Sequence, residues 1–222
     1  MGGSAKVDLM VGGRRVLDRV IAACDGWSIV LVGPPQLAAR GLLHTQERPA
    51  YDGPVAGLRA GVAAMGSRRG PVTPPGLVAT LAGDQPFLDA PGLAALASAL
   101  EFAQASAVAS AEAGGSGGGA APGSASDQLP EVAAYADDSG AIQYLCAVWH
   151  ADALRNRLAQ AGSSMRSMYA DARVLVVADP RGVARDVDTP ADFEAACAAL
   201  GDPEWSDPKL GGPALGGPAL GD

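Results

Sequence analysis

A largely apolar run, residues 77–82, leads directly into Gly83 and Asp84. Short apolar runs of this kind are typical of strands buried on both faces, which occur mainly in the parallel sheets of α/β proteins. In open α/β sheets, ligands bind beyond the carboxyl ends of the strands. A carboxylate in that place, next to substrate phosphates, is a usual ligand of Mg²⁺. Asp84 is therefore a candidate metal ligand; the alternative is that Gly-Asp-x-Pro forms only a β-turn.

Apolar strand patterns alternate with helical patterns along the chain, which favours βαβ units. The sequence thus predicts an α/β fold, a three-layer sandwich with a mostly parallel sheet and helices on both faces. Strands are expected at residues 27–32, 77–82, 105–110, 131–136, 142–149 and 173–177. Helices are expected at residues 14–24, 54–65, 91–102, 151–160, 163–169 and 190–200.

The length of 222 residues suits one domain, which we expect to span residues 1–201. Residues 113–128 are rich in Gly, Ser and Ala and predict a flexible surface insertion within it. Residues 202–222 repeat Gly-Gly-Pro-Ala-Leu and predict a disordered tail.

The net charge of −8 argues against nucleic acid as the main partner, since phosphate backbones need a basic face. A nucleotide remains compatible, because a few backbone N–H groups and one or two cations can hold a triphosphate. The three cysteines, Cys24, Cys146 and Cys197, are scattered without zinc-ligand spacing and fit a reducing cytoplasm. No signal peptide opens the chain and no apolar run approaches the length of a membrane span, so we expect a cytoplasmic protein without membrane contact.

The first residues carry a weak anion-binding pattern. Gly2 and Gly3 allow backbone N–H groups to turn toward an anion, and Lys6 adds positive charge. The alternative is a frayed chain end.

Two further segments precede predicted helices. Asp52 and Gly53 stand before the helix at residues 54–65, where Gly53 permits a ligand close to the backbone. The same residues also suit a plain helix start with Asp52 as N-cap. Asp186 and Asp188 alternate around an apolar residue and so share one side of an extended segment, which helix capping does not explain.

These motifs, in this order, resemble the MobA-like nucleotidyltransferases, the molybdenum-cofactor guanylyltransferase family. GGSAKVDLMVGGRRVLDRV is similar to a shortened form of the family's opening signature. RPAYDGPVAGLRAGV resembles its Gly-Pro-Leu-Ala-Gly segment, LAGDQPFL its metal-binding Asp motif and DVDTPADF its closing motif. The resemblance extends over about residues 2–200 and implies a Rossmann-like nucleotidyltransferase fold.

The resemblance implies transfer of GMP from GTP to molybdopterin, with Mg²⁺ as cofactor and release of pyrophosphate. It places Gly2 and Gly3 at the nucleotide, Lys6 at its phosphates and Asp84 on Mg²⁺. Asp186 and Asp188 lie near the metal or the second substrate in this scheme. Either Glu47 or Asp52 contacts the guanine.

Three alternatives stay open for the function. The donor can be CTP, the acceptor can be a sugar phosphate or another cofactor, or the chain can be a non-catalytic nucleotide- or cofactor-binding protein, a partner of molybdoenzyme maturation. The sequence also departs from the family pattern, because the first central strand is missing and the loop between Gly3 and Lys6 is short. We therefore expect two strand edges to be left open in the middle of the fold.

Overall fold

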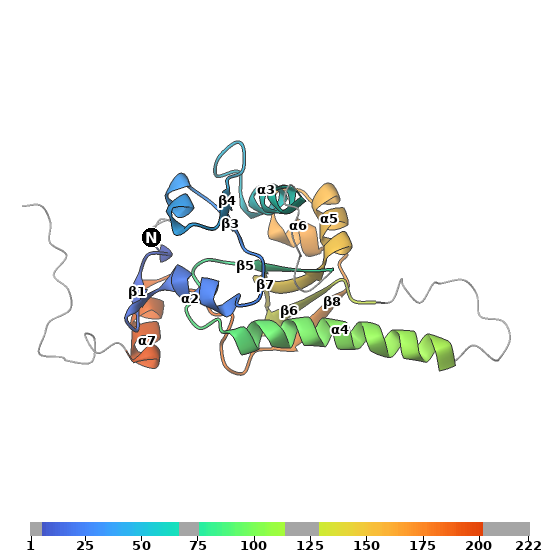
Figure 1. Cartoon of the computed structure of the whole chain (residues 1–222). Helices are drawn as coiled ribbons and strands as arrows, with labels where there is room; N and C mark the ends of the chain where they lie inside the picture. Colours follow the sequence, from blue (N-terminus) through green and yellow to red (C-terminus); the bar gives the residue numbers. More distant parts are fainter. Residues whose placement is uncertain (1–5, 67–75, 114–128, 202–222) are drawn as a thin grey trace, which may run out of the picture.

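The computed structural model describes residues 6–66, 76–113 and 129–201 (Figure 1). Gly2 and Gly3, residues 114–128 of the predicted insertion and the predicted tail at residues 202–222 lie outside the described residues. The predicted domain limits therefore stay predictions.

The largest sheet has four strands in the order β5-β7-β6-β8. They are β5 (Leu77–Leu81), β6 (Val132–Ala136), β7 (Ile142–His150) and β8 (Val174–Ala178). Strand β7 is antiparallel to both β5 and β6, whereas β6 and β8 are parallel. Three of the four strands thus run in one direction, and all five residues of β6 are buried, as expected for a central α/β strand.

Two smaller sheets lie in the N-terminal part of the chain. Strand β3 (Val30–Val32) pairs in parallel with β4 (Leu43–Thr45) after a crossover through the 3₁₀ helix η1 (Pro35–Arg40). The hairpin of β1 (Met10–Val11) and β2 (Arg14–Arg15) turns through Gly12 and Gly13, at φ values of 57° and 69°. Positive φ at both central residues is the requirement of a tight type I′ hairpin, which explains the two glycines.

Helices cover both faces of the four-stranded sheet, which gives the predicted three layers (Figure 1). Helices α2 and α4 pack on one face through Val20, Leu93 and Leu96. Helices α3, α5 and α6 pack on the other face, around the fully buried Trp149. The bounds are α2 (Val16–Ala23), α3 (Pro54–Gly66), α4 (Ala90–Ala113), α5 (Ala151–Gln160), α6 (Met165–Tyr169) and α7 (Pro190–Leu200).

Helix α4 corrects two expectations. The predicted strand at residues 105–110 is wrong, because these residues continue α4; the alanines there are strong helix formers. By length and composition, residues 90–109 of α4 could also cross a membrane, contrary to the expectation that no apolar run is long enough. Leu93, Leu96 and Leu100 of this helix are fully buried against the sheet, whereas Phe102 and Val108 are exposed.

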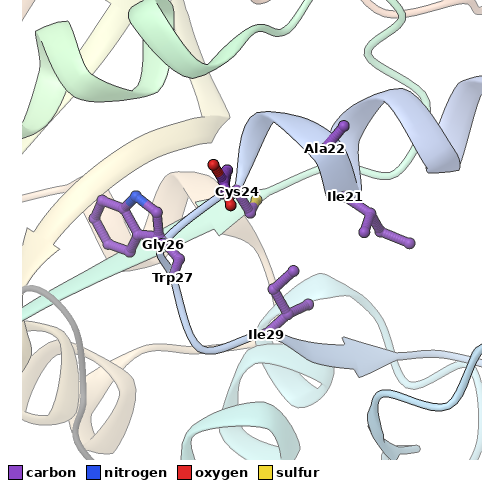
Figure 2. A pocket seen from close by; sticks show the side chains of 7 residues that line it. Ile21, Ala22, Cys24, Gly26, Trp27 and Ile29 are labelled. Carbon is purple, nitrogen blue, oxygen red and sulfur yellow. The ribbon is translucent and has the colours of Figure 1, made fainter.

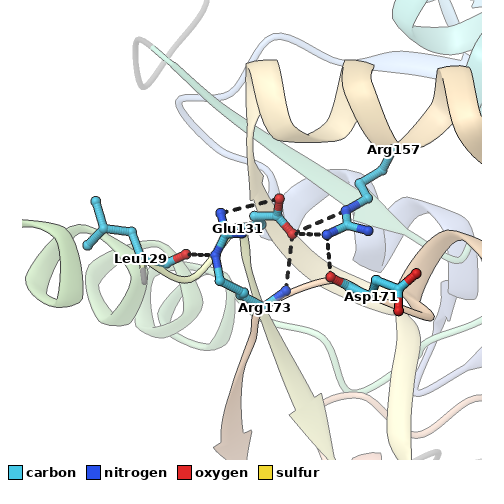
Figure 3. A network of polar contacts seen from close by, with 5 residues as sticks. All are labelled: Leu129, Glu131, Arg157, Asp171 and Arg173. Atoms are coloured by element: carbon cyan, nitrogen blue, oxygen red, sulfur yellow. Dashed lines mark hydrogen bonds and ion pairs between the residues drawn. The ribbon is translucent and has the colours of Figure 1, made fainter. Parts of the chain in front are cut away.

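A charged cluster joins one end of the sheet to its helices (Figure 3). Glu131, just before β6, accepts hydrogen bonds from Nε and Nη2 of Arg157 in α5, at 3.1 and 2.6 Å. The backbone N–H of Arg173, just before β8, donates to the same carboxylate at 3.1 Å. The Glu131 side chain is only 15% exposed, so one acidic residue fixes α5 and the start of β8 against β6.

Two strand edges lie open in the middle of the fold, as expected from the sequence. In the described residues, β3 is paired only with β4, and β5 only with β7. Between β3 and β5 lies a cavity of about 1160 Å³, which α2 and α3 line as well. We refer to this cavity as the central slot.

Candidate functional site

The structure brings four of the predicted site residues together at the carboxyl end of β5. The Lys6 ammonium group forms an ion pair with the Asp188 carboxylate, although 182 residues separate them. Asp84 and Asp186 also act on the Lys6 charge. The Lys6 side chain is only 12% exposed, so the cation is held among these three carboxylates.

Asp84 owes its position to the end of β5. The strand's pairing with β7 extends to Ala82, whose N–H donates to the Leu145 carbonyl at 2.8 Å. The buried side chain of Gln85 then donates through Nε2 to the Ala184 carbonyl at 3.1 Å. The chain thus leaves the sheet at Gly83 and presents the half-buried Asp84 at the sheet edge.

Asp186 and Asp188 are placed by the buried residue between them. Val187 is fully buried and its N–H donates to the Asp84 carbonyl at 3.0 Å. Both flanking aspartates are exposed, as the predicted alternation requires. The predicted capping box is confirmed as well, since Thr189 and Asp192 cap α7 reciprocally.

One lysine does not neutralise the three carboxylates of this site. Burial raises the pKa of Asp84, the charge of Asp188 adds to the rise, and Lys6 only partly offsets it. Burial and then the charges of Asp188 and Asp84 likewise raise the pKa of Asp186. The hydrogen bond to Asp188 raises the pKa of Lys6, which stays protonated at neutral pH. A second cation would relieve the repulsion among the acids.

The donor set suits Mg²⁺ bound together with phosphates. Among the residues that the structure describes, no group of three or more His, Cys, Asp or Glu side chains is arranged to hold a metal ion by itself. Mg²⁺ commonly takes one or two carboxylates and completes its shell with water and substrate phosphates. Asp84, half-buried and with a raised pKa, fits that role.

The residues predicted to contact the base of the nucleotide do not all lie in one place. Glu47 and Gly53 line the central slot, but Asp52 does not and is exposed. Glu47 Oε1 also accepts a hydrogen bond from the Tyr51 N–H at 2.7 Å, which fixes its carboxylate. Gly53 has a φ of 92°, a conformation that favours glycine.

The sequence did not reveal how the segment before α2 is held. Arg40 of η1 pairs with Asp18 of α2 and contacts Asp8 at 3.2 Å. Arg19 donates to the Val11 carbonyl from Nε and Nη2, at 3.0 and 2.7 Å. These contacts join residues up to 32 positions apart, and no local pattern announces them.

A second cavity, of about 440 Å³, is not a comparable site (Figure 2). It lies where α2 ends, and its walls include Ile21, Trp27 and Ile29. Its one thiol, Cys24, is buried, and burial raises its pKa to about 11, which keeps it protonated and unreactive at neutral pH.

Several solved structures that superpose on this chain are named as enzymes of nucleotidyl transfer or of molybdopterin-guanine dinucleotide biosynthesis. A nucleotidyl transferase from a Methanothermobacter species superposes with a TM-score of 0.58 at 16% identity, covering 88% of this chain and 84% of its own. Molybdopterin-guanine dinucleotide biosynthesis protein A from Archaeoglobus fulgidus gives 0.54 at 16%, covering 87% and 89%. The 2-C-methyl-D-erythritol 4-phosphate cytidylyltransferase from Thermus thermophilus gives 0.57 at 17%, covering 90% and 95%. The fold is therefore the Rossmann-like fold of this enzyme class.

The sequence comparison narrows the class to a family. The model of the MobA-like NTP transferase domain matches residues 1–174, so the chain belongs to that family of nucleotidyltransferases. A comparison with curated proteins gave no match. Members of the family generally use a divalent metal ion.

Proposed function

We propose that this protein transfers GMP from GTP to molybdopterin and releases pyrophosphate, in the cytoplasm and with Mg²⁺. Membership of the MobA-like family supports a nucleotidyl transfer. The likeness to the molybdopterin-guanine dinucleotide biosynthesis protein of Archaeoglobus fulgidus supports this donor and acceptor. The observation that carries the proposal is the group of Lys6, Asp84, Asp186 and Asp188 at the carboxyl end of β5.

The reaction is an in-line displacement at the α-phosphorus. An oxygen of the acceptor phosphate forms the new bond, and the bond to the oxygen that bridges to the β-phosphorus breaks. Asp84 would hold Mg²⁺, which would neutralise charge on the phosphates and align them. Lys6 stabilises the negative charge that collects on the leaving pyrophosphate, and its raised pKa keeps it charged.

The remaining predicted residues bind and orient the substrates. Asp186 and Asp188 lie near the metal or the acceptor, and Asp188 also holds Lys6. Glu47 is better placed than Asp52 to contact the guanine, because it lines the slot. Gly2, Gly3 and Gly53 would let the nucleotide approach the backbone.

The experiment follows pyrophosphate from GTP that is labelled at the γ-phosphate, with Mg²⁺ and molybdopterin. Labelled pyrophosphate should appear only when all three are present. Asp84→Ala should abolish turnover with the fold intact, because Asp84 lies beyond the strand end and outside the core. Asp138→Ala, in the exposed turn between β6 and β7, is the matched control and should keep full activity. Unchanged turnover in Asp84→Ala would remove this residue from the mechanism.

Two alternatives have support of their own. The cytidylyltransferase among the structural neighbours supports CTP as donor, with a sugar phosphate or another cofactor as acceptor, and replacing GTP by CTP in the same assay tests it. The short loop between Gly3 and Lys6 supports a non-catalytic nucleotide- or cofactor-binding protein that assists molybdoenzyme maturation. Nucleotide binding without pyrophosphate release, for any donor, would favour that role.

A further inference from the structure

Strand β8 lies at one edge of the four-stranded sheet, and its outer side has no partner strand in the described residues. The Glu131 N–H donates to the Arg173 carbonyl at 2.8 Å, so the backbone of Arg173 faces β6. Successive residues of a strand direct their backbone groups to opposite edges. The N–H and C=O groups of Val174, Val176 and Ala178 therefore point outward, away from β6.

This edge lacks the usual protection against pairing with another strand. Proteins block exposed edges with charged side chains, proline or bulges. Strand β8 reads Val-Leu-Val-Val-Ala and pairs with β6 in an unbroken register over all five residues. The Val176 side chain is 53% exposed, and it shares a sheet face with Val174, which packs on the side of α5 and α6. An apolar row of side chains and a row of backbone groups are thus both open along β8.

The charged residues that flank β8 make the edge complementary to itself. Arg173 precedes the strand and Asp179 follows it. When two copies of β8 lie antiparallel, with Val176 opposite Val176 of the partner copy, Arg173 of each copy lies opposite Asp179 of the other. Opposite charges across an antiparallel pair stabilise it, whereas like charges destabilise it.

Neighbouring registers of the same pair are less favourable. A shift by two residues in one direction brings Arg173 opposite Arg181 of the partner copy, and the reverse shift brings Asp171 opposite Asp179. A shift by one residue sets outward-facing backbone groups against inward-facing ones, so the ladder of hydrogen bonds does not form. The register centred on Val176 combines hydrogen bonds with opposite charges at both ends.

From this geometry we infer that β8 is a dimerisation edge, which pairs antiparallel with β8 of a second copy of the chain about a twofold axis at Val176. Three outward-facing residues on each copy supply up to about six hydrogen bonds. On the face of α5 and α6, Val176 contacts its own counterpart and Val174 contacts Ala178, so the open apolar row is covered. The two four-stranded sheets become one continuous sheet. The inference is independent of the proposed reaction.

The size of the edge sets the expected affinity. The strand has five residues, and an interface of that length lies well below the roughly 1,200 Å² that stable complexes bury. We therefore expect a reversible dimer with a dissociation constant of about 10–100 µM.

The first test is sedimentation equilibrium of the full chain over a concentration range that spans this constant. The average mass should rise from that of a monomer toward that of a dimer. Val176→Lys sets two ammonium groups opposite each other and should weaken the dimer at least about tenfold. Val108→Lys, in α4, is the matched control, because Val108 is 52% exposed and Val176 is 53% exposed. Val108→Lys should leave the association unchanged, and urea denaturation checks that both variants are folded.

The second test measures the register through an introduced cysteine. Residues that face each other in a hydrogen-bonded antiparallel pair have Cα atoms about 5.5 Å apart, within the span of a disulfide. Val176→Cys should therefore give a disulfide-linked dimer in oxidised glutathione. Ala178→Cys should give none, because the two introduced cysteines would lie about 13 Å apart along the strands. The native cysteines, Cys24, Cys146 and Cys197, are buried.

Three results would overturn the inference. A monomer at every concentration would exclude the dimer and leave the edge to a different polypeptide. Dissociation by Val108→Lys and not by Val176→Lys would assign the contact to α4. Equal cross-linking of Val176→Cys and Ala178→Cys would exclude the twofold register.

Discussion

The four-stranded sheet and the β3–β4 pair, on either side of the central slot, differ sharply in burial. In the four-stranded sheet, Val132, Ala133, Ala134, Ala147 and Val148 are all fully buried. In the β3–β4 pair, only Leu31 is buried, and the other five residues are half-buried. Strand β3, Val-Leu-Val, is as apolar as the strands of the large sheet, so its composition does not cause the difference. A strand becomes a core strand through neighbours on both edges and helices on both faces.

The largest expected effect sharpens this comparison by truncating one apolar side chain in each region. Trp149→Ala should lower the free energy of unfolding by about 3–5 kcal/mol, because it empties a fully buried site between α5 and α6. Val32→Ala should cost about 1 kcal/mol, because the isopropyl group is half-buried beside the slot. Urea denaturation measures both. Equal losses would mean that the β3–β4 pair is packed as firmly as the large sheet.

A smaller effect concerns the polar cluster at one end of the large sheet. Glu131→Gln should lower the free energy of unfolding by about 2 kcal/mol, since it weakens the charged hydrogen bonds of Arg157 and Arg173. Asp152→Asn breaks the exposed pair with Arg155 and is the control, with no measurable change expected. If the two variants unfold alike in urea, the cluster adds nothing to the sheet.

The smallest effect lies at the end of β5, the strand of the large sheet that lines the central slot. Burial raises the pKa of Asp84 above its ordinary 3.8, so its ionisation opposes folding. Its favourable contribution is complete below pH 3.8 and is lost as the pH rises through the folded-state pKa. Without nucleotide or metal, Asp84→Asn should therefore raise the melting temperature at neutral pH.

The pH series supplies the control for this last prediction. The gain in melting temperature of Asp84→Asn over the natural chain should shrink toward zero as the pH falls below 3.8. A constant gain at every pH would mean that the substitution acts through packing and not through charge.

Much of the fold follows from the sequence where the local pattern is strong. Helices α5 and α7 have their predicted limits. Strands β5, β6 and β7 each differ from their predicted limits by one residue at one end. Long apolar runs and helix caps act through residues that are close in sequence, so the elements that they predict form in the structure. Strand β3 begins three residues later than predicted, and α2 two residues later, because Arg14 and Arg15 join the hairpin.

The missed elements depend on contacts that the local pattern does not contain. Strand β4 has only three residues, Leu43 to Thr45, and exists through its pairing with β3. Residues 105–110 consist of Ala, Ser and Val, which fit the pattern of a strand and that of a helix about equally weakly. In the structure the helix that starts at Ala90 continues through them.

The sequence predicted most residues of the candidate site but not how they lie relative to one another. Asp84 and the alternation of Asp186 and Asp188 follow from strand ends and side-chain direction. The pairing of Lys6 with Asp188 joins residues 182 positions apart, and only the resemblance to the MobA-like family indicated that both belong to one site. Glu131 gave no signal at all, because its partners Arg157 and Arg173 are distant in sequence.

The hydrogen bond from the Val187 N–H to the Asp84 carbonyl makes the two acidic segments one mechanical unit. Helix α7 begins three residues after Val187. The helix packs through Ala196 and Cys197 against Val11 and Val16, so its position is fixed by the core. A substitution that loosens α7 should therefore shift Asp186 and Asp188 relative to Asp84.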